Sequence, residues 1–143
     1  MLARGHGRIV NVSSSAGLAA IPMLSAYAVS KTALYRLSEN LAAETQGHGV
    51  MVFAINPGLV RTAMSESALS CGEPSIEQWF THAFASQDDV SAESAATLVT
   101  YLASGAADVL SGRNIFATRH VTQMVAQAAE IEECDLYVLR ERE

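Results

Sequence analysis

The 143-residue sequence is poor in cysteine and has no long apolar runs. Its two cysteines, Cys71 and Cys134, lie far apart. They form neither a disulfide framework nor a metal-binding motif, and their scarcity favours a reduced, cytoplasmic compartment. No apolar run approaches the roughly 18 residues that a membrane-spanning helix needs. The opening stretch MLARGHGR has no apolar segment behind its charges, so we expect neither a membrane span nor a secretory signal there.

Charge is also scarce, and positive charge most of all. The chain has 9 Lys and Arg residues against 15 Asp and Glu residues, a net charge of -6. Nucleic-acid backbones are bound by clustered cations, so this balance argues against a nucleic-acid partner. The four histidines share no ligand spacing, and we predict no metal site from them. With 50% hydrophobic residues, the chain has the composition of one globular domain.

Apolar runs and helical periodicity alternate along the chain. The runs RIVNVSS (8–14) and VMVFAIN (50–56) are typical of buried strands, and RNIFA (113–117) predicts a short third strand. The Ala-rich segment 25–46 predicts a long helix that ends at Gly47. Further helices are expected at 76–85, 92–103 and 121–133. About three strands and four helices in alternation indicate an α/β fold with a parallel sheet.

One helical pair of side chains suggests chemistry. Tyr27 and Lys31 stand at positions i and i+4 of the predicted long helix, so they emerge on the same face. A lysine cation beside a tyrosine hydroxyl favours the phenolate and lowers the tyrosine pKa, which makes a usable general acid and base. The same spacing also arises by chance in many helices. The pair alone therefore leaves a packing role open.

Polar and turn residues follow both long strands. Ser13, Ser14 and Ser15 end the first strand, while Asn56-Pro57-Gly58 ends the second, with Thr62 close behind. Ligands of open α/β sheets bind outside the carboxyl ends of the strands. We therefore expect these residues to share one site with the start of the long helix. A serine hydrolase is disfavoured because the Gly-x-Ser-x-Gly elbow is absent.

The segments GRIVNVSSSAG, YAVSK and INPGLVRTAM, in this order and spacing, resemble the short-chain dehydrogenase/reductase (SDR) family. The likeness runs from about Gly7 to Met64 and continues more loosely through 102–115. It implies the carboxyl-terminal half of a doubly wound, Rossmann-type parallel sheet with flanking helices. Residues 1–117 would belong to that domain, with a substrate lid at 63–90, and 118–143 would form a terminal helix and tail.

The resemblance also implies an activity: hydride transfer between a nicotinamide and a small alcohol or carbonyl substrate. Ser14, Tyr27 and Lys31 match the catalytic residues of the family, with Tyr27 as general acid and base. The cofactor, NAD or NADP, would be held by Tyr27, Lys31, Pro57, Gly58, Val60 and Thr62. The helix at 26–46 would be a candidate surface for homo-oligomers.

Parts of the family pattern have no counterpart in the sequence. No Gly-rich turn between a strand and a helix is present to receive the dinucleotide pyrophosphate, and the residue that selects NAD or NADP is not readable. We therefore expect the carboxyl-terminal half of a longer enzyme, with an open edge on the strand at 8–14. The alternative is a catalytically inactive fragment that acts, if at all, as an association module.

Overall fold

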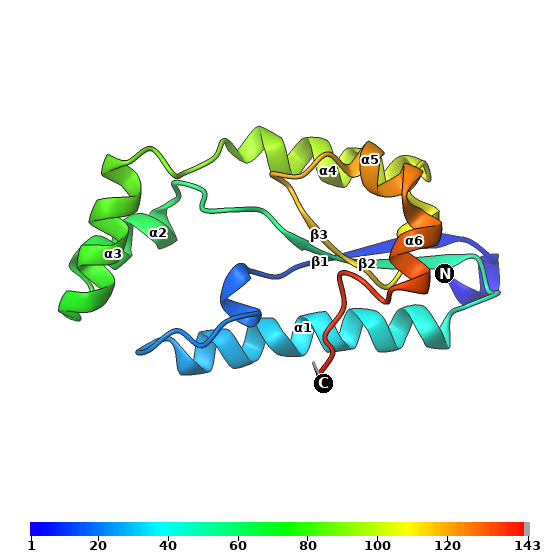
Figure 1. The fold of residues 1–143 in the computed structure, drawn as a ribbon, viewed down its shortest axis with the longest axis horizontal. Coiled ribbons are helices and arrows are strands. Elements are labelled where there is room, and N and C mark those ends of the chain that lie inside the picture. Colours follow the sequence, from blue (N-terminus) through cyan, green and yellow to red (C-terminus); the bar gives the residue numbers. More distant parts are fainter. Residues whose placement is uncertain (142–143) are drawn as a thin grey trace.

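Three parallel strands form the sheet of the computed structural model, which describes residues 1–141 (Figure 1). The strands are β1 (Gly7–Val12), β2 (Val50–Asn56) and β3 (Asn114–Phe116), in the spatial order β1-β2-β3. Both pairings are parallel, with Gly7 opposite Val50 and Ile55 opposite Ile115. The predicted α/β fold with a parallel sheet is confirmed.

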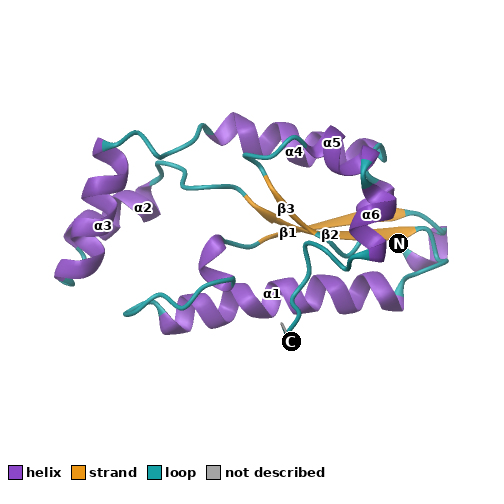
Figure 2. Ribbon diagram, in the orientation of Figure 1, coloured by secondary structure: helices purple, strands orange, loops and turns teal. Residues whose placement is uncertain are grey.

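Helices cover the sheet on both sides (Figure 2). The long helix α1 (Ser25–Glu44) connects β1 to β2 along one face. On the other face lie α4 (Ala92–Ser104), α5 (Val121–Ala126) and α6 (Ala128–Glu133). The remaining helices, α2 (Ala63–Ser67) and α3 (Pro74–Ala85), form an arm beyond the carboxyl end of β2 (Figure 1). None of the helices within residues 1–141 is long and apolar enough to cross a bilayer.

The hydrophobic core is built around β2. Val52 and Phe53 are fully buried, because this strand has a neighbour on each side and helices on both faces. The core cluster then extends through α4 and β3 into the last two helices, where Met124 and Ile131 are buried. The carboxyl-terminal helices therefore contribute to the same core as the sheet. The predicted division between 1–117 and 118–143 stays a prediction.

The elements differ from the sequence predictions in three places. The strand predicted at 8–14 is shorter and only half-buried, with Val12 49% exposed, because β1 pairs on one side alone within the described chain. The helix predicted at 121–133 is interrupted at Gln127, whose φ of -100° and ψ of 14° lie outside the helical range. Residues 63–90 contain α2 as well as the predicted helix. Together with the interruption at Gln127, this gives the described chain six α-helices instead of four.

Three short 3-10 helices connect these elements, and a fourth precedes β1. They are η1 (Leu2–Arg4), η2 (Ser15–Gly17), η3 (Ala68–Ser70) and η4 (Asp108–Leu110). The chain passes through η2 from the carboxyl end of β1 onto α1, where the hydroxyl of Thr32 donates a hydrogen bond to the carbonyl oxygen of Gly17. This short helix therefore holds the segment after β1 against the long helix.

Candidate active site

Ser14 lies immediately beyond β1, at the start of η2. Its Oγ accepts a hydrogen bond of 3.2 Å from the backbone N–H of Ala16, as the N-cap of that short helix. Its carbonyl oxygen accepts a second hydrogen bond, of 3.0 Å, from the hydroxyl of Tyr35 on α1. The serine backbone is thus held by the long helix, while its side chain is only partly buried.

Tyr27, Lys31 and Tyr35 follow one another at intervals of four residues and lie along one face of α1. The Lys31 ammonium donates a 3.1 Å hydrogen bond to the carbonyl oxygen of Val12, at the end of β1. It also lies 5.5 Å from the centre of the Tyr27 ring. The Tyr27 hydroxyl has no hydrogen-bond partner among residues 1–141 and is left available to a ligand.

The loop after β1 is fastened to α1 at close range. The hydroxyl of Ser13 donates a 2.8 Å hydrogen bond to the carbonyl oxygen of Lys31. Thr32 in turn donates a 2.8 Å bond from its hydroxyl to the carbonyl oxygen of Gly17. A Cβ at Gly17 would come within 2.7 Å of the Lys31 carbonyl carbon, so only glycine permits this approach. These contacts hold the loop on both sides of Ser14 against the second turn of α1.

Tyr35 is a residue of this site that the motifs did not point to. It is only 2% exposed, and burial raises the pKa of its hydroxyl, while a hydrogen bond to Ser13 acts in the opposite direction. Its hydroxyl is best described as a donor to the Ser14 carbonyl, since that geometry is well formed. The signal was present in the sequence, because Tyr35 extends the four-residue spacing of Tyr27 and Lys31 by one more turn.

Local hydrogen bonds and one glycine with a positive φ determine the path of the segment after β2. The Asn56 side chain accepts a 3.0 Å hydrogen bond from the N–H of Gly58. Gly58 has a φ of 83°, and a Cβ there would lie 2.7 Å from Val90. Val60 forms an isolated parallel bridge with Val90, and Thr62 caps α2 through a reciprocal pair of hydrogen bonds with Ser65.

The predicted catalytic residues are connected through other residues of the chain. Lys31 contacts the end of β1 and lies beside the Tyr27 ring, and Ser14 is bonded to α1 through Tyr35. Pro57, Gly58, Val60 and Thr62 follow the adjacent strand, at the same edge of the sheet. Within residues 1–141 no hydrogen bond joins the two groups.

The donors present suit one end of a nicotinamide dinucleotide. An ammonium has three N–H donors, and Lys31 uses one of them on Val12, which leaves donors for ribose hydroxyls. At Gly58 the backbone is left-handed, and Val90 fills the space where a side chain would lie, so this turn is close-packed. The free donors of Lys31 thus fit the ribose next to the nicotinamide. The pyrophosphate has no matching Gly-rich turn in this sequence.

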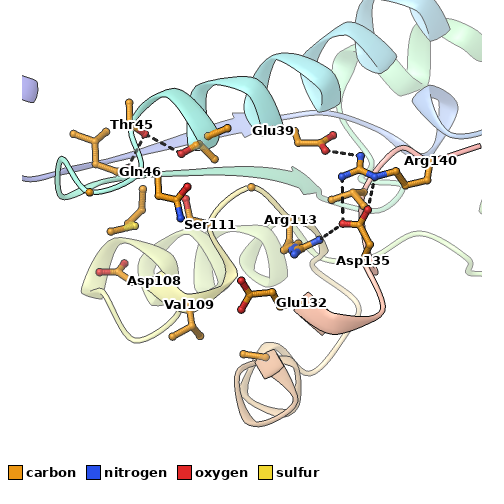
Figure 3. Close-up of a pocket in the computed structure, with 18 residues that line it drawn as sticks. Glu39, Thr45, Gln46, Asp108, Val109, Ser111, Arg113, Glu132, Asp135 and Arg140 are labelled. Carbon is orange, nitrogen blue, oxygen red and sulfur yellow. Dashed lines mark hydrogen bonds and ion pairs between the residues drawn. The ribbon is translucent and has the colours of Figure 1, made fainter. Parts of the chain in front are cut away.

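A separate cavity of about 360 Å³ lies at the other end of the sheet (Figure 3). It is lined by residues that precede β2 and β3, and by the segment that follows α6. Arg140 reaches across it to Glu39 of α1 and to Asp135, and Arg113 also contacts Asp135 (Figure 3). This ion-pair network holds the segment after α6 against α1. The cavity is at the amino ends of the strands, away from Ser14 and Tyr27.

Comparison with known proteins places the chain. Residues 1–119 match a family model described as enoyl-(acyl carrier protein) reductase. The chain belongs to the short-chain dehydrogenase/reductase family. Among curated SDR proteins, dehydrogenase/reductase SDR family member 4 of Bos taurus is 36% identical over 115 residues, which cover 80% of this chain and 40% of the relative.

Solved SDR structures share the fold. Actinorhodin polyketide ketoreductase with NADPH matches with a TM-score of 0.69 and 29% identity, over 81% of this chain and 47% of that protein. A 4-hydroxyisoleucine dehydrogenase complexed with NADH matches with a TM-score of 0.58 and 28% identity, over 77% and 44%. The chain thus spans less than half the length of these relatives. It has a partial Rossmann-type fold, and its structural neighbours are nicotinamide-dependent oxidoreductases.

Proposed function

We propose that this chain carries the proton-transfer half of a NAD(P)-dependent SDR site that interconverts alcohols and carbonyl compounds. The observation that carries the proposal is the position of Lys31, which is hydrogen-bonded to Val12 and lies 5.5 Å from the Tyr27 ring. Tyr35 of the same helix donates a hydrogen bond to the Ser14 carbonyl oxygen. This arrangement sets a proton donor, a cation and a hydroxyl at the carboxyl end of β1, where α/β proteins bind ligands.

Each residue has a separate role in the proposal. Tyr27 passes a proton to or from the substrate oxygen, since its hydroxyl has no partner in the described chain. Lys31 supplies positive charge beside it and donates to the cofactor ribose. Ser14 holds and polarises the carbonyl or alcohol oxygen. Its Oγ already accepts from Ala16, so its own proton is free to be donated to the substrate.

The backbone at Pro57, Gly58 and Val60, together with the Thr62 hydroxyl, would hold the carboxamide end of the cofactor. A bound nicotinamide supplies or accepts the hydride, and the protein provides position and proton transfer. These residues do not distinguish NAD from NADP, because they would hold the nicotinamide end and not the part in which the two dinucleotides differ. The proposed cytoplasmic location rests on composition alone.

The arm at 63–90 is the proposed substrate lid, and it exposes large apolar side chains among its polar ones. Met64 is 70% exposed and Trp79 is 57% exposed, while Phe84 is buried beneath the Arg61 guanidinium, 4.1 Å from its ring centre. Phe84 therefore serves the packing of the arm. The exposed side chains leave an apolar surface that suits a hydrophobic alcohol or ketone.

Cofactor binding is tested by using the chemistry of Lys31, the only lysine in the chain. An amine-selective reagent will modify Lys31 and the amino terminus, and peptide mass spectrometry separates the two. We expect NADPH or NADH, at about ten times its dissociation constant, to slow modification of Lys31 about tenfold and to leave Met1 unaffected. Equal rates at Lys31 with and without either cofactor contradict the proposal for this chain.

Turnover is tested with the Tyr27→Phe variant, on a panel of aliphatic and aromatic alcohols and ketones with each cofactor. Loss of the general acid and base should lower turnover by roughly 10²–10⁴-fold. Tyr137→Phe, on the opposite end of the chain, serves as the matched control. An unchanged rate in Tyr27→Phe contradicts the role of Tyr27.

A second candidate function is an inactive fragment that associates through its surface. The half-buried edge of β1 favours it, because an unpaired strand edge is a template for another strand. The exposed side of α1, where Val29 is 69% and Leu37 is 47% exposed, is the proposed alternative surface for homo-oligomers. A defined oligomer by light scattering, together with no cofactor protection of Lys31, favours this candidate over catalysis.

A further inference from the structure

A second cavity, of about 270 Å³, lies between α4 and the segment that leads from β3 into α5. The two helices lie side by side on the face of the sheet opposite α1 (Figure 1). No residue of the candidate active site lines this cavity. It is therefore a separate feature, and what it binds is independent of the proposed catalysis.

The lining of this cavity combines hydrogen-bond donors with an apolar floor. Leu98, Ala117 and Val121 provide the apolar part. The polar part consists of four hydroxyl side chains and two nitrogen-bearing side chains: Ser94, Thr97, Tyr101, Thr122, Arg119 and His120. Ser94, Thr97 and Tyr101 share one face of α4 by their spacing. None of these four hydroxyls has a hydrogen-bond partner among the described residues, so each remains free to donate.

The charge of the cavity is opposite to that of the chain. The whole sequence carries a net charge of -6, yet no carboxylate is among the described residues that line this space. Arg119, which lines the cavity, carries a full positive charge, and the His120 imidazole adds hydrogen-bonding nitrogens. A site with cationic and hydroxyl donors and no acidic group is complementary to an anion.

Arg119 is also unusual among the arginines. Five arginines of the described chain have a carboxylate oxygen within 4.0 Å, whereas Arg119 and Arg4 have none. Arg119 is instead positioned by aromatic rings, with its guanidinium 5.6 Å from the Phe116 ring centre and 5.5 Å from that of Tyr137. One 3.4 Å hydrogen bond to the Tyr137 hydroxyl uses a single donor. The remaining N–H groups are left for a ligand.

We propose that this cavity binds a small organic anion, with a carboxylate or phosphate head held by Arg119 and the α4 hydroxyls. A short apolar body of the same ligand lies on Leu98, Ala117 and Val121. The planar guanidinium presents paired donors that match either head group. The hydroxyls of Thr97 and Tyr101 complete the donor set from the other wall.

The test is a titration of the whole chain followed by two-dimensional ¹H–¹⁵N NMR. The probes are inorganic phosphate, phenyl phosphate and benzoate, added at matched ionic strength with sodium chloride as the background. We expect saturable shifts of amides at 94–101 and 117–122. Phenyl phosphate and benzoate distinguish a phosphate from a carboxylate preference, and the comparison with inorganic phosphate measures the contribution of the apolar floor.

The variants make the result specific. Arg119→Gln should raise the dissociation constant of the preferred probe about tenfold, and Arg119→Lys should restore only part of the affinity, because it keeps the charge without the planar donors. Arg4→Gln, which removes the other arginine without a carboxylate, should leave the constant unchanged. Thr97→Val removes a donor on α4 without touching the aromatic contacts of Arg119, and should weaken binding while the rest of the spectrum stays as in the parent.

Two outcomes overturn the proposal. One is the absence of saturable shifts at 94–101 and 117–122 with all three probes. The other is an equal loss of affinity in Arg119→Gln and Arg4→Gln, which would indicate general attraction of anions to positive charge. Neither outcome bears on the catalytic proposal, since Tyr27 and Lys31 are unchanged in every variant.

Discussion

The Lys31 ammonium is fixed between two neighbours: it donates a 3.1 Å hydrogen bond to the carbonyl oxygen of Val12 and lies 5.5 Å from the centre of the Tyr27 ring. Val12 is the last residue of β1, and Tyr27 lies in the first turn of α1. A flexible lysine side chain is therefore anchored to the sheet before any ligand arrives. The same residue connects the strand, the helix and the proposed proton donor.

Replacement of Lys31 by Met should affect both stability and catalysis. The lost hydrogen bond leaves the Val12 carbonyl to solvent, and we expect the free energy of unfolding to fall by about 1 kcal/mol in urea titrations. Turnover, where it is measurable, should fall with it because the cation beside Tyr27 is gone. Lys31→Arg keeps the charge and should recover more stability than activity. A Met variant as stable as the parent would show that the Val12 bond contributes nothing.

Replacement of Tyr35 by Phe tests the support of Ser14. The change removes the donor to the Ser14 carbonyl and leaves the buried ring in place. We expect a loss of about 1 kcal/mol in the free energy of unfolding. Because the Ser14 backbone loses an anchor, kcat should fall more than KM rises. A variant whose amide spectrum around Ser14 matches that of the parent contradicts this positioning role.

The same tyrosine makes stability depend on alkaline pH. Burial raises the pKa of Tyr35 above the 10.0 of an unperturbed tyrosine. The unfolded chain then loses this proton at a lower pH than the folded chain, so unfolding becomes easier as the pH rises through that interval. The stabilisation is complete below about pH 10 and is lost above it. The free energy of unfolding should therefore decrease between about pH 9 and about pH 11. This decrease should be smaller in Tyr35→Phe than in a Tyr137→Phe control, which keeps Tyr35.

Much of the fold follows from local patterns. The apolar runs of β2 and β3 and the long Ala-rich helix are visible because burial imposes periodicity on neighbouring residues. The pair Tyr27 and Lys31 is visible for the same reason, since helical spacing alone sets both on one face. Contacts between different elements can be predicted from sequence mainly at strand ends, because the carboxyl ends of parallel strands lie at the same edge of the sheet.

Other features depend on contacts that sequence spacing does not reveal. The Tyr35 hydroxyl reaches a carbonyl 21 residues earlier, and Arg140 reaches Glu39 across 101 residues. The interruption of the last helix at Gln127 lies in a stretch whose composition favours helix throughout. These outcomes are set by packing in three dimensions, where the partner is distant along the chain.

Gly17 is expected to tolerate no side chain. An alanine Cβ there would lie 2.7 Å from the Lys31 carbonyl carbon, and helix backbone does not move aside. The clash should push η2 away from α1 and lower the free energy of unfolding by about 2 kcal/mol.

Gly7→Ala is the matched control. A Cβ at Gly7 would meet the Met1 side chain, which has other rotamers available. The loss of unfolding free energy in the same urea titration should therefore be smaller than in Gly17→Ala. Equal losses in the two variants contradict the proposed packing of η2.

Gly58 and Gly72 share a φ of 83°, and their comparison separates backbone strain from crowding. Alanine at either position has to adopt a left-handed conformation, which costs about 1–2 kcal/mol. At Gly72 no atom lies within 4 Å of the added Cβ, whereas at Gly58 the Cβ would lie 2.7 Å from the Val90 side chain. Gly58→Ala should therefore lose more unfolding free energy than Gly72→Ala, because it also displaces Val90 from its bridge with Val60.

The same two variants test cofactor binding. Protection of Lys31 by the cofactor should weaken in Gly58→Ala and persist in Gly72→Ala. Equal protection in both variants would mean that the backbone after β2 does not hold the cofactor.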